Sequence, residues 1–281
     1  MTPTYSRLTI DDRDVAWLTL ERPDVHNAFD DSLIAELNDH LRRVGELAHR
    51  NEVRALVLGS EGKSFSAGAD LNWMKRMLDY DFEDNLADSR ELSALMHGLD
   101  TLPCPTVCRV QGAAFGGAVG LAACCDIVVA SEKAKFCLSE VRIGLSPAVI
   151  SPYVQRALGE RQMRRYALTA EVMDAATAEA LGLAHRVVAA EDLDAAVTAM
   201  VDTLLDTSPQ ASRATKALLA EVARAPDSNT TRDHTCRMIS ELRVSHEGQE
   251  GLASFFEKRR PAWTQGTTRN DSDTTATERR S

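Results

Sequence analysis

The 281-residue sequence lacks a long apolar run, a positive net charge and any C-x-x-C motif. No stretch approaches the roughly 20 apolar residues that a membrane helix needs. Residues 1–14 also lack the apolar segment of a signal peptide. The net charge of −10 disfavours nonspecific binding to nucleic acid or to anionic membranes. We therefore expect a cytoplasmic protein that binds neither, although a local basic site for a phosphorylated ligand remains compatible with this charge.

Metal-ligand spacing is absent as well. The six cysteines are expected to be reduced thiols in the core, and the seven histidines show no H-x-x-x-H pair. The sequence therefore predicts no metal site. With 44% hydrophobic and 26% charged residues, the chain has the composition of a globular protein, and its length fits one large domain or one domain with an appendage.

The richest stretch is residues 105–147, which reads as a strand, a tight turn and the start of a helix. A β-branched run at Thr106–Val110 is followed by Gly116 and Gly117, which lead into a helix-compatible run over residues 118–125. Unpaired N–H groups at a helix N-terminus favour a developing negative charge. The plain alternative is that the glycine pair forms only a turn.

Downstream of this turn, Glu140 is the one carboxylate in an apolar run over residues 136–144. Apolar surroundings raise the pKa of a carboxyl group, which suits it to act as an acid or a base. The alternative is a solvated glutamate, or one that is paired with Arg142 or with a lysine.

The same order of strand, small-residue turn and helix occurs earlier in the chain, at residues 53–58 followed by residues 67–70. Strands that alternate with helical segments favour a parallel sheet with crossover connections. One backbone N–H from each turn could then converge on a single oxygen atom.

The remaining segments define the expected organisation. Residues 8–10 and 15–20 predict a hairpin, and residues 32–48 have the apolar spacing of an amphipathic helix. After residue 147 the pattern is largely helical. We place a core at residues 1–191, a helical region at residues 192–265, and a polar tail, expected to be disordered, at residues 266–281.

Five motifs in this order resemble the crotonase (enoyl-CoA hydratase/isomerase) superfamily over residues 8–263. They are RPDVHNAF at 22–29, SFSAGADL at 64–71, the run from PTVCRV to AACCD at 105–126, FCLSEVRIGL at 136–145 and FFEKRRPAW at 255–263. The resemblance implies an α/β fold, a spiral of ββα units with a C-terminal helical region that forms homotrimers and often hexamers.

The resemblance also implies the site residues. The backbone N–H groups of Ala69 and Gly117 would form an oxyanion hole, and Glu140 would be the catalytic carboxylate. Coenzyme A would enter as part of an acyl-CoA substrate, with no separate cofactor. The implied substrate- or coenzyme A-binding residues are His26, Ala28, Ala67, Gly68, Asp70, Leu71, Gly116, Gly120, Phe255 and Lys258, the last two often supplied by a neighbouring subunit.

Two positions depart from the family pattern. His26 stands where many relatives have lysine or arginine, which weakens the expected phosphate contact. Family hydratases usually carry two catalytic glutamates, and the first of these positions is Gly120 here. Asp70 is interpreted equally well as a loop hydrogen-bond acceptor or as a coenzyme A contact.

The residues within these motifs resemble those of hydratases that act on branched glutaconyl-CoA esters. The two substrates are 3-methylglutaconyl-CoA in leucine degradation and isohexenylglutaconyl-CoA in acyclic terpene degradation. Our hypothesis is that the second carboxylate of such a substrate, or Arg142 or Tyr153 holding it, compensates for the missing glutamate. Two alternatives stay open. One is a Δ3,Δ2-enoyl-CoA isomerase that uses a single glutamate, and the other is a noncatalytic member that binds acyl-CoA or RNA.

Overall fold

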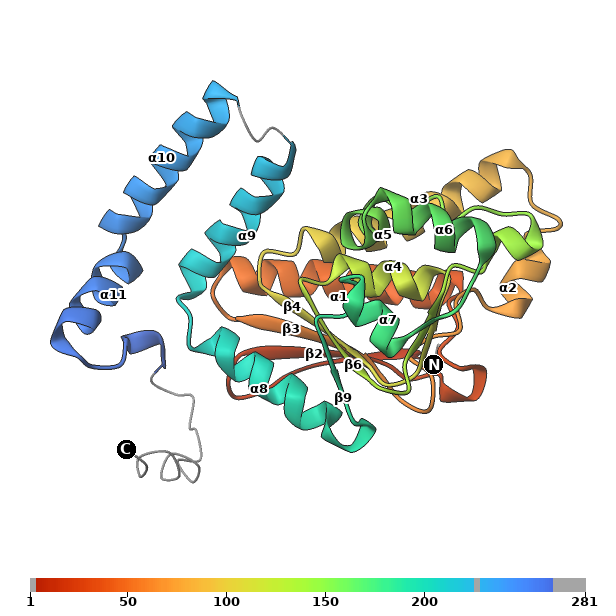
Figure 1. Ribbon diagram of the computed structural model, residues 1–281, viewed down its shortest axis with the longest axis horizontal. Helices are drawn as coiled ribbons and strands as arrows, with labels where there is room; N and C mark the ends of the chain where they lie inside the picture. Colours follow the sequence, from red (N-terminus) through yellow and green to blue (C-terminus); the bar gives the residue numbers. More distant parts are fainter. Residues whose placement is uncertain (1–3, 225–227, 265–281) are drawn as a thin grey trace. The chain divides into compact units, whose positions relative to one another are not determined.

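The computed structural model describes residues 4–224 and 228–264. Its larger sheet has six strands, and Figure 1 shows how they are arranged. An antiparallel hairpin of β1 and β2 forms one edge, and the other strands join in parallel in the order β1-β2-β3-β4-β6-β9. The strands are β1 (Ser6–Ile10), β2 (Val15–Leu20), β3 (Ala55–Ser60), β4 (Thr106–Val110), β6 (Ile127–Ser131) and β9 (Arg186–Val188). The predicted hairpin and parallel sheet are thus confirmed.

A second, smaller sheet carries the turns of interest. Its strands run in the order β5-β7-β8, at β5 (Ala113–Phe115), β7 (Lys135–Cys137) and β8 (Met173–Asp174). Ser66 extends this sheet beside β5, because its N–H donates to Ala113 O at 3.0 Å and its O accepts from Phe115 N at 3.0 Å. The first turn, the second turn and the segment before Glu140 are therefore tied together by backbone hydrogen bonds.

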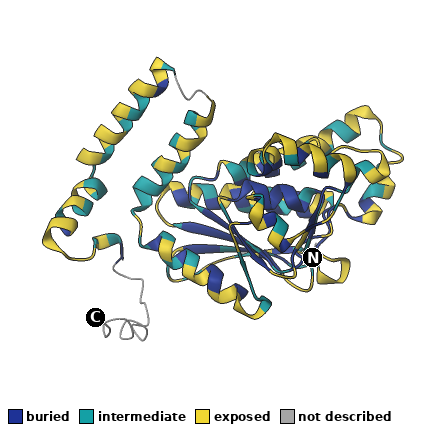
Figure 2. Cartoon of the chain, in the orientation of Figure 1, coloured by how far each residue is buried: buried dark blue, intermediate teal, exposed yellow. Residues whose placement is uncertain are grey.

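Helices cover both faces of the larger sheet. Figure 1 shows α1, α3 and α4 on one face and the first part of α8 along the other. The helices of this part of the chain are α1 (Asp31–His49), α2 (Leu71–Arg76), α3 (Phe82–Asp100), α4 (Gly117–Cys124), α5 (Ser151–Leu158), α6 (Glu160–Thr169), α7 (Ala175–Ala180) and α8 (Leu193–Leu205). Buried residues gather in the sheet and on the helix faces against it (Figure 2).

Amphipathic spacing explains α1. Its apolar residues at the predicted positions, among them Leu33, Leu37 and Val44, are buried. The helix begins where Asp30 caps it by accepting a hydrogen bond from Leu33 N at 2.9 Å. By contrast, α4 is apolar all round and almost entirely buried, as expected of a helix enclosed on every side.

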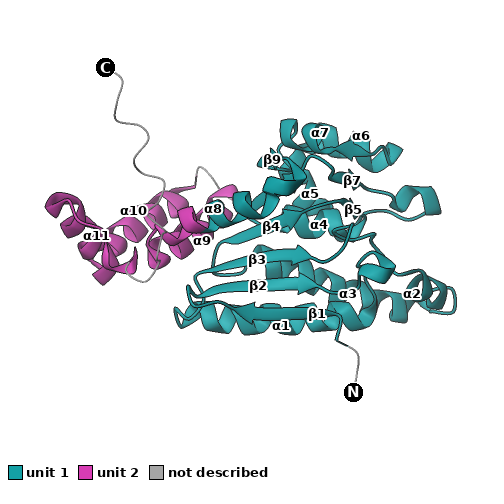
Figure 3. Ribbon diagram, turned by 90° about the horizontal axis from the view of Figure 1, so that it is seen from below, with its two compact units in different colours: residues 1–201 teal, residues 202–281 magenta. Residues whose placement is uncertain are grey.

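The chain forms two compact units, residues 1–201 and residues 202–281 (Figure 3). The second unit contains α9 (Pro209–Arg224), α10 (Asn229–Val244) and α11 (His246–Glu257). The division falls inside α8, whereas the sequence pattern places it at residues 191 and 192, just before that helix. The predicted disordered tail, residues 266–281, lies outside the described residues.

The described residues include no helix long and apolar enough to cross a membrane, and no cluster of three or more metal-ligating side chains. Within the same residues the six cysteines form no disulfide, and all except Cys236 are buried.

Candidate active site

Two glycine turns touch each other at the centre of the site. Gly68 has φ +90°, and a Cβ atom there would lie 2.9 Å from Phe115 O and 3.8 Å from Gly116 Cα. Gly116 has φ +54°, and its Cβ would lie 4.0 Å from Gly68 Cα. Only glycine combines left-handed backbone with so close an approach. The predicted meeting of the two turns is therefore present in the structure.

Each turn supplies one backbone donor. Phe29 N donates to Gly68 O, and Asp70 N donates to Phe29 O, both at 2.7 Å, so Ala69 stands between two paired residues. Gly117 is the first residue of α4, where the N–H groups have no intrahelical acceptor. In the described chain neither the Ala69 N–H nor the Gly117 N–H has a hydrogen-bond acceptor. Both are thus available to donate to a ligand.

Glu140 reaches the same place from the smaller sheet. Gly116 N donates to Cys137 O at 2.9 Å, which fixes the segment just before Glu140 against the second turn. A Cβ on Gly116 would lie 3.4 Å from Glu140 Oε1. Glu140 begins a 3-10 turn, Glu140–Ile143. Strand β7 ends before it, at Cys137.

The carboxylate is poorly solvated. Its Oε2 atom is buried and has no hydrogen-bond partner among the described residues. Desolvation raises the pKa of Glu140 above its usual value, and a hydrogen bond from its own backbone N–H partly opposes the rise. Such a group gives up and takes back protons more readily near neutral pH than an ordinary glutamate does.

The position of the missing glutamate is filled by apolar side chains. A Cβ on Gly120 would lie 2.3 Å from Ile150 Cγ2, 2.8 Å from Ile150 Cβ and 3.1 Å from Met96 Sδ. No side chain fits there unless Ile150 moves. Gly120 lies in α4, about one helical turn after Gly116, the N-cap residue of that helix, so the wall next to the glycine turns is hydrocarbon and thioether.

Several of the predicted coenzyme A residues lie together. Ala67 N donates to His26 O at 2.9 Å, and His26 Nδ1 lies 3.1 Å from Ser64 Oγ. His26 and Asn27 have φ near +53°, and the buried Asn27 holds this bend by donating from Nδ2 to Glu61 O and Ser64 O. The predicted segments 26–28 and 67–71 are therefore adjacent.

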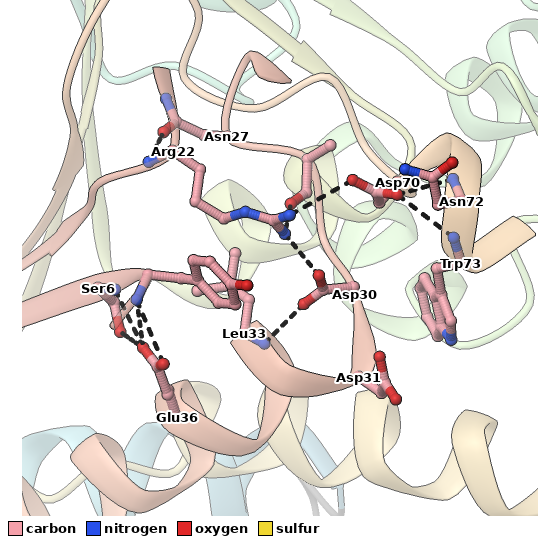
Figure 4. Close-up of polar contacts among 12 residues, drawn as sticks. Ser6, Arg22, Asn27, Asp30, Asp31, Leu33, Glu36, Asp70, Asn72 and Trp73 are labelled. Carbon is pink, nitrogen blue, oxygen red and sulfur yellow. Dashed lines mark hydrogen bonds and ion pairs between the residues drawn. The ribbon is translucent and has the colours of Figure 1, made fainter. Parts of the chain in front are cut away.

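Asp70 and Leu71 differ in exposure. Asp70 is buried and caps α2 by accepting hydrogen bonds from Asn72 N at 2.7 Å and Trp73 N at 3.3 Å, which is the loop role considered for it (Figure 4). Leu71 is 75% exposed at the start of α2 and is open to a ligand. Phe255 and Lys258 belong to the second unit, at the end of α11, and Phe255 is 76% exposed.

The two candidates for holding a substrate carboxylate are engaged elsewhere. Arg142 Nη2 donates to Ala170 O at 2.6 Å. Tyr153 packs beneath the Arg156 guanidinium, 5.8 Å from its ring centroid, and burial raises the pKa of its hydroxyl. Within the described part of the chain, neither side chain forms a hydrogen bond or an ion pair with the Glu140 carboxylate.

Sequence reasoning missed three contributors to the site. Ile150 and Met96 come from distant segments, and the only local signal was a glycine inside an apolar helix, which indicates close packing. The third contributor is Arg22, the first residue of the RPDVHNAF motif. Its contacts to Asp30 and Asp70 form only in the folded chain.

Comparisons with known proteins agree with this geometry. The family model described as enoyl-CoA hydratase/isomerase matches residues 11–266. The enoyl-CoA hydratase AKT6-1 of Alternaria alternata is 34% identical over 246 residues, 86% of this chain and 78% of that protein.

Solved structures are similar as well. An enoyl-CoA hydratase from Shewanella pealeana is 49% identical with a TM-score of 0.88, covering 93% of this chain and 97% of that one. Pseudomonas aeruginosa AtuE is 33% identical with a TM-score of 0.89, covering 93% of this chain and 100% of that one. The chain therefore belongs to the enoyl-CoA hydratase/isomerase family and has the crotonase fold.

Proposed function

We propose that this protein adds water reversibly across the double bond of an enoyl-CoA thioester, with Glu140 as its single acid–base group. The observation that carries the proposal is the cluster of Gly68, Gly116 and Glu140. It joins two unpaired N–H donors, on Ala69 and Gly117, to a desolvated carboxylate.

The two donors suit the charge that develops in this chemistry. When a nucleophile adds to the β-carbon, the electron pair of the double bond moves toward the thioester oxygen. Preorganised N–H groups stabilise that oxyanion, and losing one such donor costs roughly 3–4 kcal/mol of barrier. Because these donors are main-chain atoms, the backbone conformation of the two turns determines where they point.

One carboxylate can complete the addition. Ionised Glu140 takes a proton from a water molecule while the water oxygen bonds the β-carbon and an enolate forms. The protonated Glu140 then gives that proton to the α-carbon, and the thioester carbonyl forms again. The raised pKa supports the first step, because a carboxylate whose pKa is raised is a stronger base toward water.

For the substrate we propose a branched enoyl-CoA with a second carboxylate, either 3-methylglutaconyl-CoA or isohexenylglutaconyl-CoA. The motif resemblance supports this choice. So does the apolar wall at Gly120, since it provides no second protein carboxylate and leaves that charge to the substrate. Arg142 or Tyr153 would orient the substrate carboxylate after leaving its present contacts.

The same wall favours a second candidate, a Δ3,Δ2-enoyl-CoA isomerase. In this reaction Glu140 removes a proton from the α-carbon of a β,γ-enoyl thioester and returns it at the γ-carbon. Ile150 and Met96 would then shield the dienolate from water. One carboxylate is sufficient for both transfers.

We further propose that the protein works in the cytoplasm as a homotrimer or a hexamer, without a cofactor beyond the coenzyme A of its substrate. Phe255 and Lys258 of a neighbouring subunit would complete coenzyme A binding. Support comes from the motif resemblance and from the exposure of Phe255.

The deciding experiment incubates the purified protein in H₂¹⁸O with 3-methylglutaconyl-CoA, crotonyl-CoA or a β,γ-enoyl-CoA, and follows the products by mass spectrometry. Labelled hydroxyl product from 3-methylglutaconyl-CoA, with weak turnover of crotonyl-CoA, would support the hydratase. Unlabelled product from the β,γ-enoyl-CoA alone would select the isomerase. Thioester binding without any turnover would indicate the noncatalytic alternative and refute both.

A further inference from the structure

Arg22 lies between the larger sheet and the candidate site, just after β2 ends. Its side chain is only 13% exposed, and its guanidinium lies over the Tyr5 ring, 4.2 Å from the centroid. Tyr5 is itself fixed, because its N–H donates to the Glu36 carboxylate of α1. The guanidinium is therefore held in one place from outside the site.

This guanidinium connects two helix caps from distant parts of the sequence (Figure 4). Arg22 Nη1 donates to Asp30 Oδ2 at 2.8 Å, and Asp30 caps α1. Arg22 Nη2 lies 3.5 Å from Asp70 Oδ2, and Asp70 caps α2. Nη1 also donates to Ala28 O at 3.0 Å. One side chain thus joins the segment of residues 28–30 to the segment that ends at Asp70.

One proposed oxyanion donor, Ala69, belongs to the second of these segments, and the other, Gly117, packs against the first. Phe29 pairs with Ala69 through the two backbone hydrogen bonds that flank the first donor. The Phe29 ring supports the second donor, because a Cβ on Gly117 would lie 3.3 Å from Phe29 Cε2. A shift of residues 28–30 would therefore move both N–H groups relative to the Glu140 carboxylate.

We propose that Arg22 is a positioning residue for the oxyanion site. The inference rests on the proposed function, because it needs a reaction that places charge on the thioester oxygen. Arg22 acts through the backbone and does not touch the substrate. The planar guanidinium presents several donors at fixed angles, whereas a lysine ammonium at the same place cannot serve Asp30, Asp70 and Ala28 O together.

The test compares Arg22→Lys with the matched variant Arg13→Lys. Arg13 also forms a partly buried ion pair, with Asp11 at 3.1 Å, but it lies at the opposite end of β2 from Arg22. Asp30→Asn is a second variant of the cluster. Asparagine still caps α1 but weakens the hold of Arg22. Circular dichroism and thermal unfolding establish that each variant is folded.

Two readouts separate positioning from a general structural role. The first readout compares the effect of each substitution on kcat with its effect on KM. The second is the carbonyl stretching frequency of bound butyryl-CoA, a saturated thioester that can be neither hydrated nor isomerised. Two well-placed donors polarise this carbonyl and lower its frequency relative to the free thioester.

We expect Arg22→Lys to lower kcat by about 10- to 100-fold, the loss typical of small misplacements at a reacting centre, with a smaller change in KM. The carbonyl stretching frequency of butyryl-CoA bound to this variant should lie closer to that of the free thioester. Asp30→Asn should show the same change to a smaller extent, and Arg13→Lys should match the wild type in both readouts.

Folded Arg22→Lys with wild-type kcat and wild-type carbonyl frequency would overturn the inference and leave the proposed function standing. Equal losses in Arg13→Lys would also overturn it. Wild-type protein that neither binds butyryl-CoA nor turns over any enoyl-CoA would overturn the proposed function, and with it the role of Arg22.

Discussion

At the scale of single residues, the environment of Glu140 determines how activity and stability respond to pH. The ionised form is needed to take the first proton, and desolvation raises the pKa above the usual 4.5. We therefore expect kcat/KM to fall as the pH is lowered through a midpoint above 4.5. A pH–rate profile with its acid midpoint at or below 4.5 would contradict the assignment.

The same shift has a consequence for folding. The folded state binds the Glu140 proton more tightly than the unfolded state does. Ionised Glu140 therefore costs stability above the raised pKa, and this cost disappears as the pH falls below 4.5. Relative to the wild type, Glu140→Gln should become more stable as the pH rises from 4 to 8. Urea unfolding of both proteins across this range measures the difference, and a pH-independent difference would contradict the desolvated carboxylate.

Two glycines inside helices should respond oppositely to alanine. A Cβ on Gly120 would collide with Ile150, so Gly120→Ala should cost about 1–3 kcal/mol of unfolding free energy. A Cβ on Gly98 of α3 would meet Leu41 Cδ1 at 3.8 Å, an ordinary contact. Gly98→Ala should therefore gain about 0.5–1 kcal/mol from the higher helix propensity of alanine.

Chemical denaturation of the two variants provides the measurement, and the Ile150→Ala background provides its control. In that background the cost of Gly120→Ala should shrink without vanishing, because Ile150 Cγ2, at 2.3 Å, is removed while the Cβ of residue 150, at 2.8 Å, remains. An equal cost in both backgrounds would show that Ile150 does not fill the position next to Gly120.

At the scale of elements, the first glycine turn should be more sensitive to alanine than another glycine with positive φ elsewhere in the chain. Gly68→Ala combines a left-handed backbone with a contact of 2.9 Å to Phe115 O, whereas Gly159, with φ +75°, has nothing within 4 Å of its Cβ position. We expect Gly159→Ala to cost about 1–3 kcal/mol, because φ +75° with ψ 154° is a backbone conformation that alanine rarely adopts, and to keep wild-type kcat.

Gly68→Ala should cost more stability than Gly159→Ala and should also lower kcat, because the turn that carries Ala69 must move away from Phe115. Thermal unfolding and steady-state kinetics on the two variants measure both effects. Equal kcat in Gly68→Ala and Gly159→Ala would argue against a catalytic role for this turn.

Elements with a strong periodic signal were predictable from the sequence. Helix α1 and the β1–β2 hairpin occur where their apolar spacing placed them. Strands β5 and β8, with three and two residues, carry too little pattern to be recognised alone and form because neighbouring segments supply their hydrogen bonds. The 3-10 turn at Glu140, with four residues, is equally short and carries no pattern of its own.

The site itself was only partly predictable. The two glycine turns are local features, and the parallel sheet brings them together, so their convergence followed from the sequence. Other contacts join residues that are far apart in the chain. Ile150 packs against Gly120, and Arg22 forms ion pairs with Asp30 and Asp70. Such contacts depend on the finished packing and leave no local pattern.

At the scale of the whole molecule, the exposed aromatic pair of α11 bears on assembly. Phe255 and Phe256 are 76% and 78% exposed in the single chain. For the proposed homotrimer or hexamer we expect a native mass of three or six times the 30.7 kDa chain. Phe255→Asp should lower that mass, because a carboxylate is costly in an apolar interface.

Light scattering coupled to gel filtration measures the native mass, and Phe255→Tyr is the control because it keeps the ring. A wild-type protein that elutes with the mass of one chain would refute the proposed trimer or hexamer.

The central claim is that Glu140 alone performs proton transfer on a thioester held by the two turns. Glu140→Gln tests it most directly, since glutamine keeps the shape of the side chain but cannot accept the proton. The measurement is kcat on the substrate that the ¹⁸O experiment identifies, together with the affinity for butyryl-CoA. We predict that kcat falls about 10²- to 10⁴-fold while butyryl-CoA binds as in the wild type. Ordinary turnover by Glu140→Gln would contradict the account.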